Sequence, residues 1–359
     1  MIRRYAGSSL ALFLFIGLPA GAAWPATFAL TSPLSATCVT DPQAVYSVQN
    51  GVLKPVSGQF SIFSPGEQPL QPVCSMTSSA APGQLARFYL WSTEPLSGLS
   101  AQIGAAGKNP LTRSTGFRAS TSEAVEMWAV LIGIPADSAV KQLTVTLTAV
   151  AGDRTFMLLK PFSVTARKFL TEKISLTKDL TALVTVPNPQ QTIESKRLAE
   201  ILSTPHPDAL YATQAFDDPL PGARRSAGYG DRREYLYTDG TDGLSIHYGV
   251  DIASPTGTPV PACAPGKVVL AENRILTGNS VVIEHLPGLF SVYYHMSALV
   301  VKEGDVVDKG DIIGKVGMTG FATGPHLHWE VENMGVAVDP DSLVNGPLLD
   351  KSADFIDIE

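Results

Sequence analysis

The chain has 359 residues, of which 45% are hydrophobic and 16% are charged, and its formal net charge is −7. This length favours two domains with connecting segments, and the hydrophobic content is sufficient for packed cores, which excludes a largely disordered chain. A negative chain without a basic stripe is not typical of nucleic-acid-binding proteins, and it gains no simple electrostatic attraction to anionic surfaces.

The start of the chain has the pattern of a signal peptide, which we predict over residues 1–22. "MIRR" supplies positive charge, and an apolar run follows from Leu10 to Leu18, about half the length of a membrane span. Ala20 and Ala22 give the small-residue pattern of a cleavage site. No cysteine follows the run directly, so we expect no lipid anchor and no stable membrane span after cleavage. We therefore predict export, to a periplasm, the cell envelope or the exterior.

The three cysteines suit an oxidising compartment. Cys38 and Cys74 both lie in the N-terminal region and could form a disulfide there. Cys263 is left over within "TPVPACAPG", and we expect it to be a small buried hydrophobe. The chain has no Cys-x-x-Cys motif, which excludes a cysteine zinc site of that kind.

Residues 23–165 are predicted to form a β domain. From Gln142 to Gly152 leucine and valine alternate with threonine, the period of a half-buried strand. Further strands are expected at "ARFYLWS", "VEMWAVLIGI" and "FMLLKPFSV", which clusters of glycine, proline and serine separate. Several short strands at this spacing predict an immunoglobulin-like sandwich. The region has no histidine, so we expect no metal chemistry in it, and the sequence identifies no partner for it.

Residues 166–222 are interpreted as a linker with one helix. The stretch "NPQQTIESKRLAEILSTP" places apolar residues at helical spacing between Pro189 and Pro205. Residues 223–345 then form a second, glycine-rich domain, in which turn glycines separate short apolar pairs such as Ile312-Ile313. This pattern predicts tight hairpins in a compact antiparallel β domain. An acidic tail, 346–359, follows.

Five of the six histidines fall in this second domain. His326 and His328 share one face of an expected strand, and His247 and Asp251 share a face if their segment is extended, with Gly249 allowing them a close approach. Two imidazoles on one face are costly to bury without a metal or hydrogen-bond partners. Imidazole and carboxylate are suitable zinc ligands, and three protein ligands leave a fourth position for water. An H-x-H pair alone is weak evidence, and the combined clusters carry the prediction.

Two long stretches give these histidines a family context. They read "HYGVDIASPTGTPVPACAPGKVV" and "GNSVVIEHLPGLFSVYYHMSALVVKEGDVVDKGDIIGKVGMTGFATGPHLHWE". The segment from about Gly228 to Asp339 resembles the M23 family of zinc metallopeptidases, the lysostaphin-like peptidoglycan endopeptidases. The resemblance covers about a third of the chain and includes each motif position of that family.

The resemblance implies one zinc ion per chain, bound by His247, Asp251 and His328. It implies that His326 is the general base, and that His295 orients the attacking water or stabilises the oxyanion. The division of roles between these two histidines stays open. The implied reaction is hydrolysis of peptide bonds in peptidoglycan cross-links or stem peptides. The sequence shows no separate wall-targeting module of the kind that glycine-bridge lysins carry, so we favour D-alanyl–diaminopimelate bonds over glycine bridges.

Other polar residues of the region receive different interpretations. His285 is assigned a structural role at a strand end, and His206 is expected to be solvated in the linker. Glu330 shares a face with His326 and His328, so it could support a ligand or belong to the strand surface.

A non-catalytic or autoinhibited M23-like module is the alternative function. Such a module would bind peptidoglycan or activate another cell-wall hydrolase. Access to the groove would be limited by the N-terminal domain or the linker. All three ligand positions and both further histidines are present, which favours the enzyme.

Overall fold

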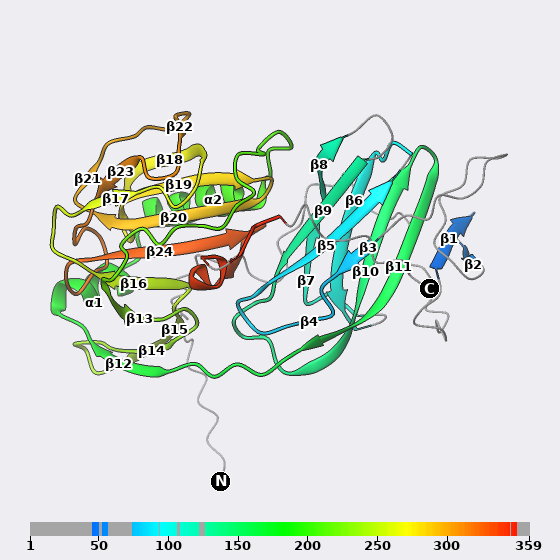
Figure 1. Ribbon diagram of the computed structural model, residues 1–359. Coiled ribbons are helices and arrows are strands. Elements are labelled where there is room, and N and C mark those ends of the chain that lie inside the picture. The colour runs from blue at the N-terminus through cyan, green and yellow to red at the C-terminus, as the bar shows by residue number, and fades with distance from the viewer. Residues whose placement is uncertain are drawn as a thin grey trace, which may run out of the picture.

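The computed structural model shows a mainly β chain, which confirms the predicted fold class (Figure 1). The predicted signal peptide, the predicted pairing of Cys38 with the Cys74 side chain, and most of the acidic tail lie outside the described part. The structure describes residues 45–49, 52–56, 74–92, 94–105, 108–121, 126–344 and 346–349.

The N-terminal domain consists of two sheets packed face to face. Its inter-sheet core contains Phe88 and Ile132 from one sheet and Val145 and Phe162 from the other. The first sheet has the strand order β2-β1-β11-β10-β6-β7, with β4 beside β11, and the second the order β3-β5-β9-β8. Their bounds are β1 (Val45–Gln49), β2 (Val52–Val56), β3 (Cys74–Met76), β4 (Ser79–Ala80), β5 (Leu85–Ser92), β6 (Gly98–Gly104), β7 (Thr112–Thr115), β8 (Phe117–Thr121), β9 (Glu126–Gly133), β10 (Lys141–Ala151) and β11 (Arg154–Val164).

The predicted strands of this domain are confirmed. Strand β10 shows the alternation directly, because Leu143, Val145 and Leu147 are buried while the intervening threonines are half-buried. The stretches expected in β5, β9 and β11 also form strands. The period of two therefore placed β10, whereas the other three strands were placed as apolar runs between clusters of glycine, proline and serine.

The C-terminal domain is built on an eight-stranded sheet whose neighbouring pairs are antiparallel. One face of the sheet carries the main core, which includes Trp329, Tyr293 and Val250. The predicted compact β domain is confirmed. The large sheet comprises β13 (Arg224–Ala227), β16 (Gly249–Ala253), β24 (His326–Asn333), β20 (Leu289–Met296), β19 (Gly278–Leu286), β18 (Gly266–Arg274), β22 (Val306–Val307) and β25 (Val336–Val338); a small sheet comprises β17 (Pro259–Pro261), β23 (Ile312–Lys315) and β21 (Ala298–Leu299), and the 3-10 helix η2 (Pro340–Leu343) follows.

The segment expected to be a linker with one helix contains two helices and a strand. These are β12 (Thr171–Ser175), α1 (Lys178–Thr185) and α2 (Pro189–Ser203). Strand β12 pairs in parallel with β14 (Arg232–Leu236), which pairs with β15 (Asp242–Ile246). Helix α1 escaped the sequence analysis because it is only eight residues long and three of them, two threonines and one valine, have modest helix propensity.

Tertiary packing holds this segment on the C-terminal domain. In α2, Leu198 and Leu202 are buried against Leu270, Phe290 and Tyr294 of the large sheet. The α1 residue Val184 packs in a separate cluster with Leu176 and Tyr235. The segment is thus part of the C-terminal domain's core, and it covers the face of the sheet opposite to the main core.

We expect Leu198→Ala to destabilise the protein by about 2–5 kcal/mol, because it leaves a cavity under α2. Ile193→Ala in the same helix is the matched control: Ile193 is 59% exposed and Leu198 is 1% exposed. The control should change the free energy of unfolding by less than ~0.5 kcal/mol. Denaturant unfolding would measure both variants. Equal effects would show that α2 does not pack as described.

The two domains share an interface at the Asn333 end of β24. The Gly133 N–H donates to the Asn333 Oδ1 at 2.9 Å, and the Asp339 N–H donates to the Gly83 carbonyl at 2.7 Å. Apolar residues of the N-terminal sandwich, such as Leu131, pack against the core of the C-terminal domain. In Figure 1 the arrowhead of β24 points toward the sandwich. The first residue of this strand, His326, lies at the opposite end.

No helix in the described part of the chain is long and apolar enough to cross a membrane.

Candidate metal centre

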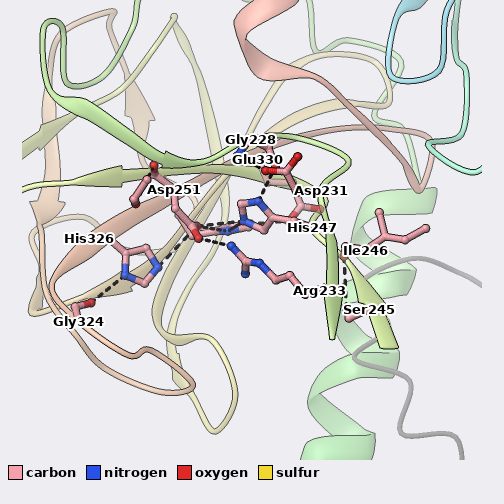
Figure 2. Close-up of polar contacts among 12 residues, drawn as sticks. Gly228, Asp231, Arg233, Ser245, Ile246, His247, Asp251, Gly324, His326 and Glu330 are labelled. Carbon is pink, nitrogen blue, oxygen red and sulfur yellow. Dashed lines mark hydrogen bonds and ion pairs between the residues drawn. The ribbon is translucent and has the colours of Figure 1, made fainter. Parts of the chain in front are cut away.

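Three ligand-type side chains converge at β16 and β24 of the large sheet, and Figure 2 labels two of them, His247 and Asp251. Asp251 of β16 lies directly opposite His328 of β24, and His247 precedes β16. Three atoms, the His247 Nε2, the Asp251 Oδ1 and the His328 Nδ1, are mutually 3.0 Å apart. All three residues are buried. Sequence reasoning selected these three residues, and the structure brings them together.

Each of the two imidazoles has an inner nitrogen, which belongs to the triangle of ligand atoms, and an outer nitrogen, which points away from it. The hydrogen bond at the outer nitrogen determines whether the inner nitrogen can bind a metal ion. The His247 Nδ1 lies 2.8 Å from the Gly228 carbonyl, and the His328 Nε2 lies 3.0 Å from a Glu330 oxygen. A carbonyl and a carboxylate only accept, so these outer nitrogens carry hydrogen. The inner nitrogens of the neutral rings then present lone pairs. Two such nitrogens and one carboxylate oxygen fit a zinc ion with one open position.

The charges of the cluster also suit a cation. Burial raises the pKa of Asp251, but His247, His328 and Arg233 outweigh it and hold that pKa well below the usual range. Burial lowers the pKa of His328, but hydrogen bonds to Asp251 and Glu330 raise it to about 9. A metal ion would displace this proton, so its affinity falls as the pH falls.

Gly249 gives the His328 ring its space. A Cβ at this position would lie 2.5 Å from the Trp329 carbonyl oxygen and 2.8 Å from the His328 Nε2. The sequence analysis explained this glycine by an approach between His247 and Asp251. The structure instead shows that the glycine accommodates a ligand ring from the neighbouring strand.

His295 and His326 lie beside the three ligand-type residues. The His326 Nε2 is 3.5 Å from the Asp251 Oδ1, and the rings of His295 and His326 are 4.8 Å apart. Each Nδ1 lies 2.8 Å from a carbonyl, that of Gly324 for His326 and that of Thr319 for His295. Both Nδ1 atoms therefore carry hydrogen, and both Nε2 atoms are acceptors in the neutral rings.

The backbone of His295 is in the left-handed region, with φ of 63°. In a regular strand Tyr294 and His295 would point to opposite faces. Here Tyr294 stacks on His328 with ring centroids 5.3 Å apart, and His295 lies 6.1 Å from the same ring. The pairing of β19 with β20 shifts register at this point. Such a conformation costs about 1–3 kcal/mol and is typical of functional sites.

Burial keeps the His295 ring neutral. It lowers the pKa of His295 to about 3, and the neighbouring His326 and His328 act in the same direction. His295 is therefore an uncharged imidazole at neutral pH.

Two buried glutamates, Glu330 and Glu332, follow His328 at every second position of β24. Glu330 accepts the hydrogen bond from His328, which settles the open interpretation of Glu330 in favour of contact with a ligand-type residue. Burial, and then the charge of Glu330, raise the pKa of Glu332 well above its usual value. This shift favours the neutral form of Glu332. The sequence analysis did not identify Glu332, since a glutamate on an alternating strand reads as a surface residue.

His285 and Cys263 lie apart from the candidate site. The His285 Nδ1 is 2.7 Å from the Pro265 carbonyl and its Nε2 is 2.7 Å from the Ser291 Oγ. Cys263 is buried. His206 has a largely exposed side chain whose Nδ1 meets Glu284 at 2.5 Å.

We expect His285 to make stability depend on pH. Burial lowers its pKa to about 4 from the ordinary value of 6.5. Below pH 6.5 the unfolded chain therefore binds a proton that the folded chain excludes, and stability is lost as the pH falls toward 4. This loss should reach about 3 kcal/mol.

His285→Gln removes this titration. The difference in unfolding free energy between wild type and variant should shrink by about that amount between pH 7 and pH 4. Denaturant unfolding at several pH values would show it. A difference that stays constant over this range would contradict the buried, neutral imidazole.

The fold and the site together define a candidate metallohydrolase domain in a mainly β protein. Residues 245–340 match Peptidase family M23. The chain is 40% identical over 127 residues to the DD-carboxypeptidase/endopeptidase Mpg of Neisseria meningitidis serogroup B, covering 35% of this chain and 28% of Mpg. It is 44% identical over 91 residues to the peptidoglycan DD-endopeptidase ShyA of Vibrio cholerae serotype O1, covering 25% of this chain and 21% of ShyA.

A part of the chain is also similar to a solved structure. The catalytic domain of the antimicrobial peptidase lysostaphin from Staphylococcus simulans is 35% identical, covering 34% of this chain and 92% of that domain, with a TM-score of 0.29. The C-terminal domain of this chain therefore contains a match to peptidase family M23. It spans less than a third of the length of the two curated relatives.

Proposed function

We propose that the protein is an exported zinc metalloendopeptidase that hydrolyses peptide bonds in peptidoglycan cross-links or stem peptides. One observation carries the proposal: the mutually 3.0 Å triangle of ligand atoms from His247, Asp251 and His328, with two further imidazoles beside it. The relatives named as peptidoglycan endopeptidases support the substrate class. The name of one of these relatives places its substrate in peptidoglycan, which lies outside the cytoplasmic membrane. This supports a site of action in the periplasm, cell envelope or exterior.

His247, Asp251 and His328 would hold the zinc ion. When bound, zinc supplies Lewis-acid activation of the scissile carbonyl and of a water molecule. The His326 Nε2 accepts a proton from the attacking water, because its Nδ1 hydrogen is engaged by Gly324. His326 then returns this proton to the leaving amine.

The hydrogen bonding suggests a division of roles between the two histidines. His295 also presents an acceptor Nε2, since its Nδ1 donates to Thr319. An oxyanion needs a donor, and the neutral His295 ring has none to offer at Nε2. We infer that His295 orients the water by accepting a hydrogen bond from it, and that it does not stabilise the oxyanion.

The test uses the chain from Ala23 onward with purified peptidoglycan, and mass spectrometry of the released fragments. We expect cut cross-links, lost with a zinc chelator and regained with added zinc. Release of D-alanyl–diaminopimelate ends would assign the bond that we favour, while release from glycine bridges would assign the other bond. If no fragments were released from peptidoglycan with either kind of cross-link, the proposal would be contradicted.

The low exposure of the site favours an autoinhibited enzyme as the second candidate. His247 is 3% exposed and His328 is 8% exposed. The sandwich meets the C-terminal domain at the Asn333 end of β24, and its Ala136 carbonyl also accepts from Arg232 of β14, next to the Arg233 that contacts Asp251. Strand β12 of the segment 166–222 pairs with β14, and Leu176 and Val184 of this segment pack with Tyr235, so the segment and the sandwich are both candidates for a cover. Zinc binding without cleavage by the full chain, with cleavage after loss of this cover, would support this second function.

A further inference from the structure

Arg233, a residue that the sequence analysis did not select, contacts a ligand carboxylate (Figure 2). Its Nη2 lies 2.5 Å from the Asp251 Oδ2. The other oxygen of the same carboxylate, Oδ1, faces the His247 Nε2 and the His328 Nδ1 at 3.0 Å. The two oxygens of Asp251 therefore have different partners, one the arginine and the other the ligand triangle.

The arginine is itself held in place. It lies in β14, the central strand of a three-stranded sheet, opposite Glu172 of β12 and Ser245 of β15. Burial lowers the pKa of Arg233, but the charges of Asp251 and Tyr235 outweigh it and raise that pKa above its usual value. Only 15% of its side chain is exposed.

Tyr235 in turn is fixed by the segment between the domains. It packs with Leu176 and with Val184 of α1, and its ring meets Phe321 edge-on at 5.3 Å. The orientation of Arg233 thus depends on packing contributed by β12 and α1. This connects the segment 166–203 to the carboxylate of the metal centre.

We propose that Arg233 is a positioning residue that holds Asp251 with a single oxygen toward the zinc ion. This inference rests on the proposed function, since it takes zinc as the cation. A free carboxylate can rotate and offer either oxygen or both. Pairing of Oδ2 with a fixed guanidinium removes that freedom and leaves Oδ1 at the ligand triangle.

Two effects of opposite sign make the proposal testable. The positive charge of Arg233 repels a divalent cation, so its removal alone would tighten zinc binding. Loss of positioning would weaken zinc binding, and loss of such supporting contacts typically costs about 10–100-fold in metal affinity. The direction of the change therefore distinguishes a positioning residue from a nearby charge.

The experiment measures the zinc dissociation constant of the full chain by competition with a chromophoric chelator. We expect Arg233→Gln to weaken zinc binding by about 10–100-fold, and Arg233→Lys to weaken it less. Arg232→Gln is the matched control, because Arg232 donates to the Gly230 and Ala136 carbonyls and not to Asp251. This control should stay within ~3-fold of wild type.

Zinc binding by Arg233→Gln that equals or exceeds that of wild type would overturn the proposal. Thermal unfolding of the metal-free chains shows whether each variant is folded. If Arg233→Gln does not fold, Arg233→Lys decides the matter: weaker zinc binding supports positioning, and unchanged binding overturns it. A wild-type chain that binds zinc but cuts no peptidoglycan would refute the proposed function while leaving the positioning role intact.

Discussion

Replacement of His328 by alanine is expected to abolish both zinc retention and cleavage of peptidoglycan. His328 supplies one corner of the 3.0 Å triangle, and its removal leaves two ligand atoms. We expect kcat/KM to fall by about 10³-fold or more, because Lewis-acid activation supplies several kcal/mol. Asp251→Ala should have the same effect, since Oδ1 of that residue is another corner.

Metal analysis of the purified variants and fragment release from peptidoglycan would measure the two losses. His206→Ala is the matched control, because His206 has a largely exposed side chain and contacts Glu284 outside the candidate site. It should retain zinc and activity. If the His328 variant bound zinc and cut at the wild-type rate, the ligand assignment would be wrong.

Replacement of His326 by alanine is expected to separate catalysis from metal binding. His326 lies at the edge of the site, with its Nε2 3.5 Å from the Asp251 Oδ1, and it is not a corner of the triangle. Loss of a general base lowers the rate by about 10²–10⁴-fold. Zinc content should stay at one ion per chain.

The comparison of metal content with kcat is the decisive readout for this variant. His295→Ala should also retain zinc and lose activity, since His295 is a neighbour of His326 and not one of the three ligand-type residues. Loss of zinc from the His326 variant would show that this residue is a ligand. An unchanged kcat would remove it from the catalytic machinery.

Local patterns explain why much of the fold could be predicted. The period of two in residues such as Leu143, Val145 and Leu147 places β10, because one face of that strand is buried. The short helix α1 lacks a comparable signal. Its stability comes from contacts with Leu176 and Tyr235, which are tertiary and leave no local pattern in the sequence.

The candidate site likewise contains residues that local spacing predicts and residues whose role depends on tertiary structure. His326 and His328 could be placed on one strand face from their spacing, and β24 confirms that strand. The contribution of Arg233 depends on the pairing of β12 with β14, which no local pattern predicts. The direction of the His295 side chain depends on a positive φ, which breaks the alternation that the prediction assumed.

The most direct test of the central claim is a zinc titration of the metal-free chain from Ala23 onward, assayed on a purified cross-linked muropeptide. Activity should be absent without metal, rise in proportion to added zinc, and level off at one equivalent per chain. Full activity of the metal-free chain, or no activity at one bound equivalent, would contradict a catalytic zinc held by His247, Asp251 and His328.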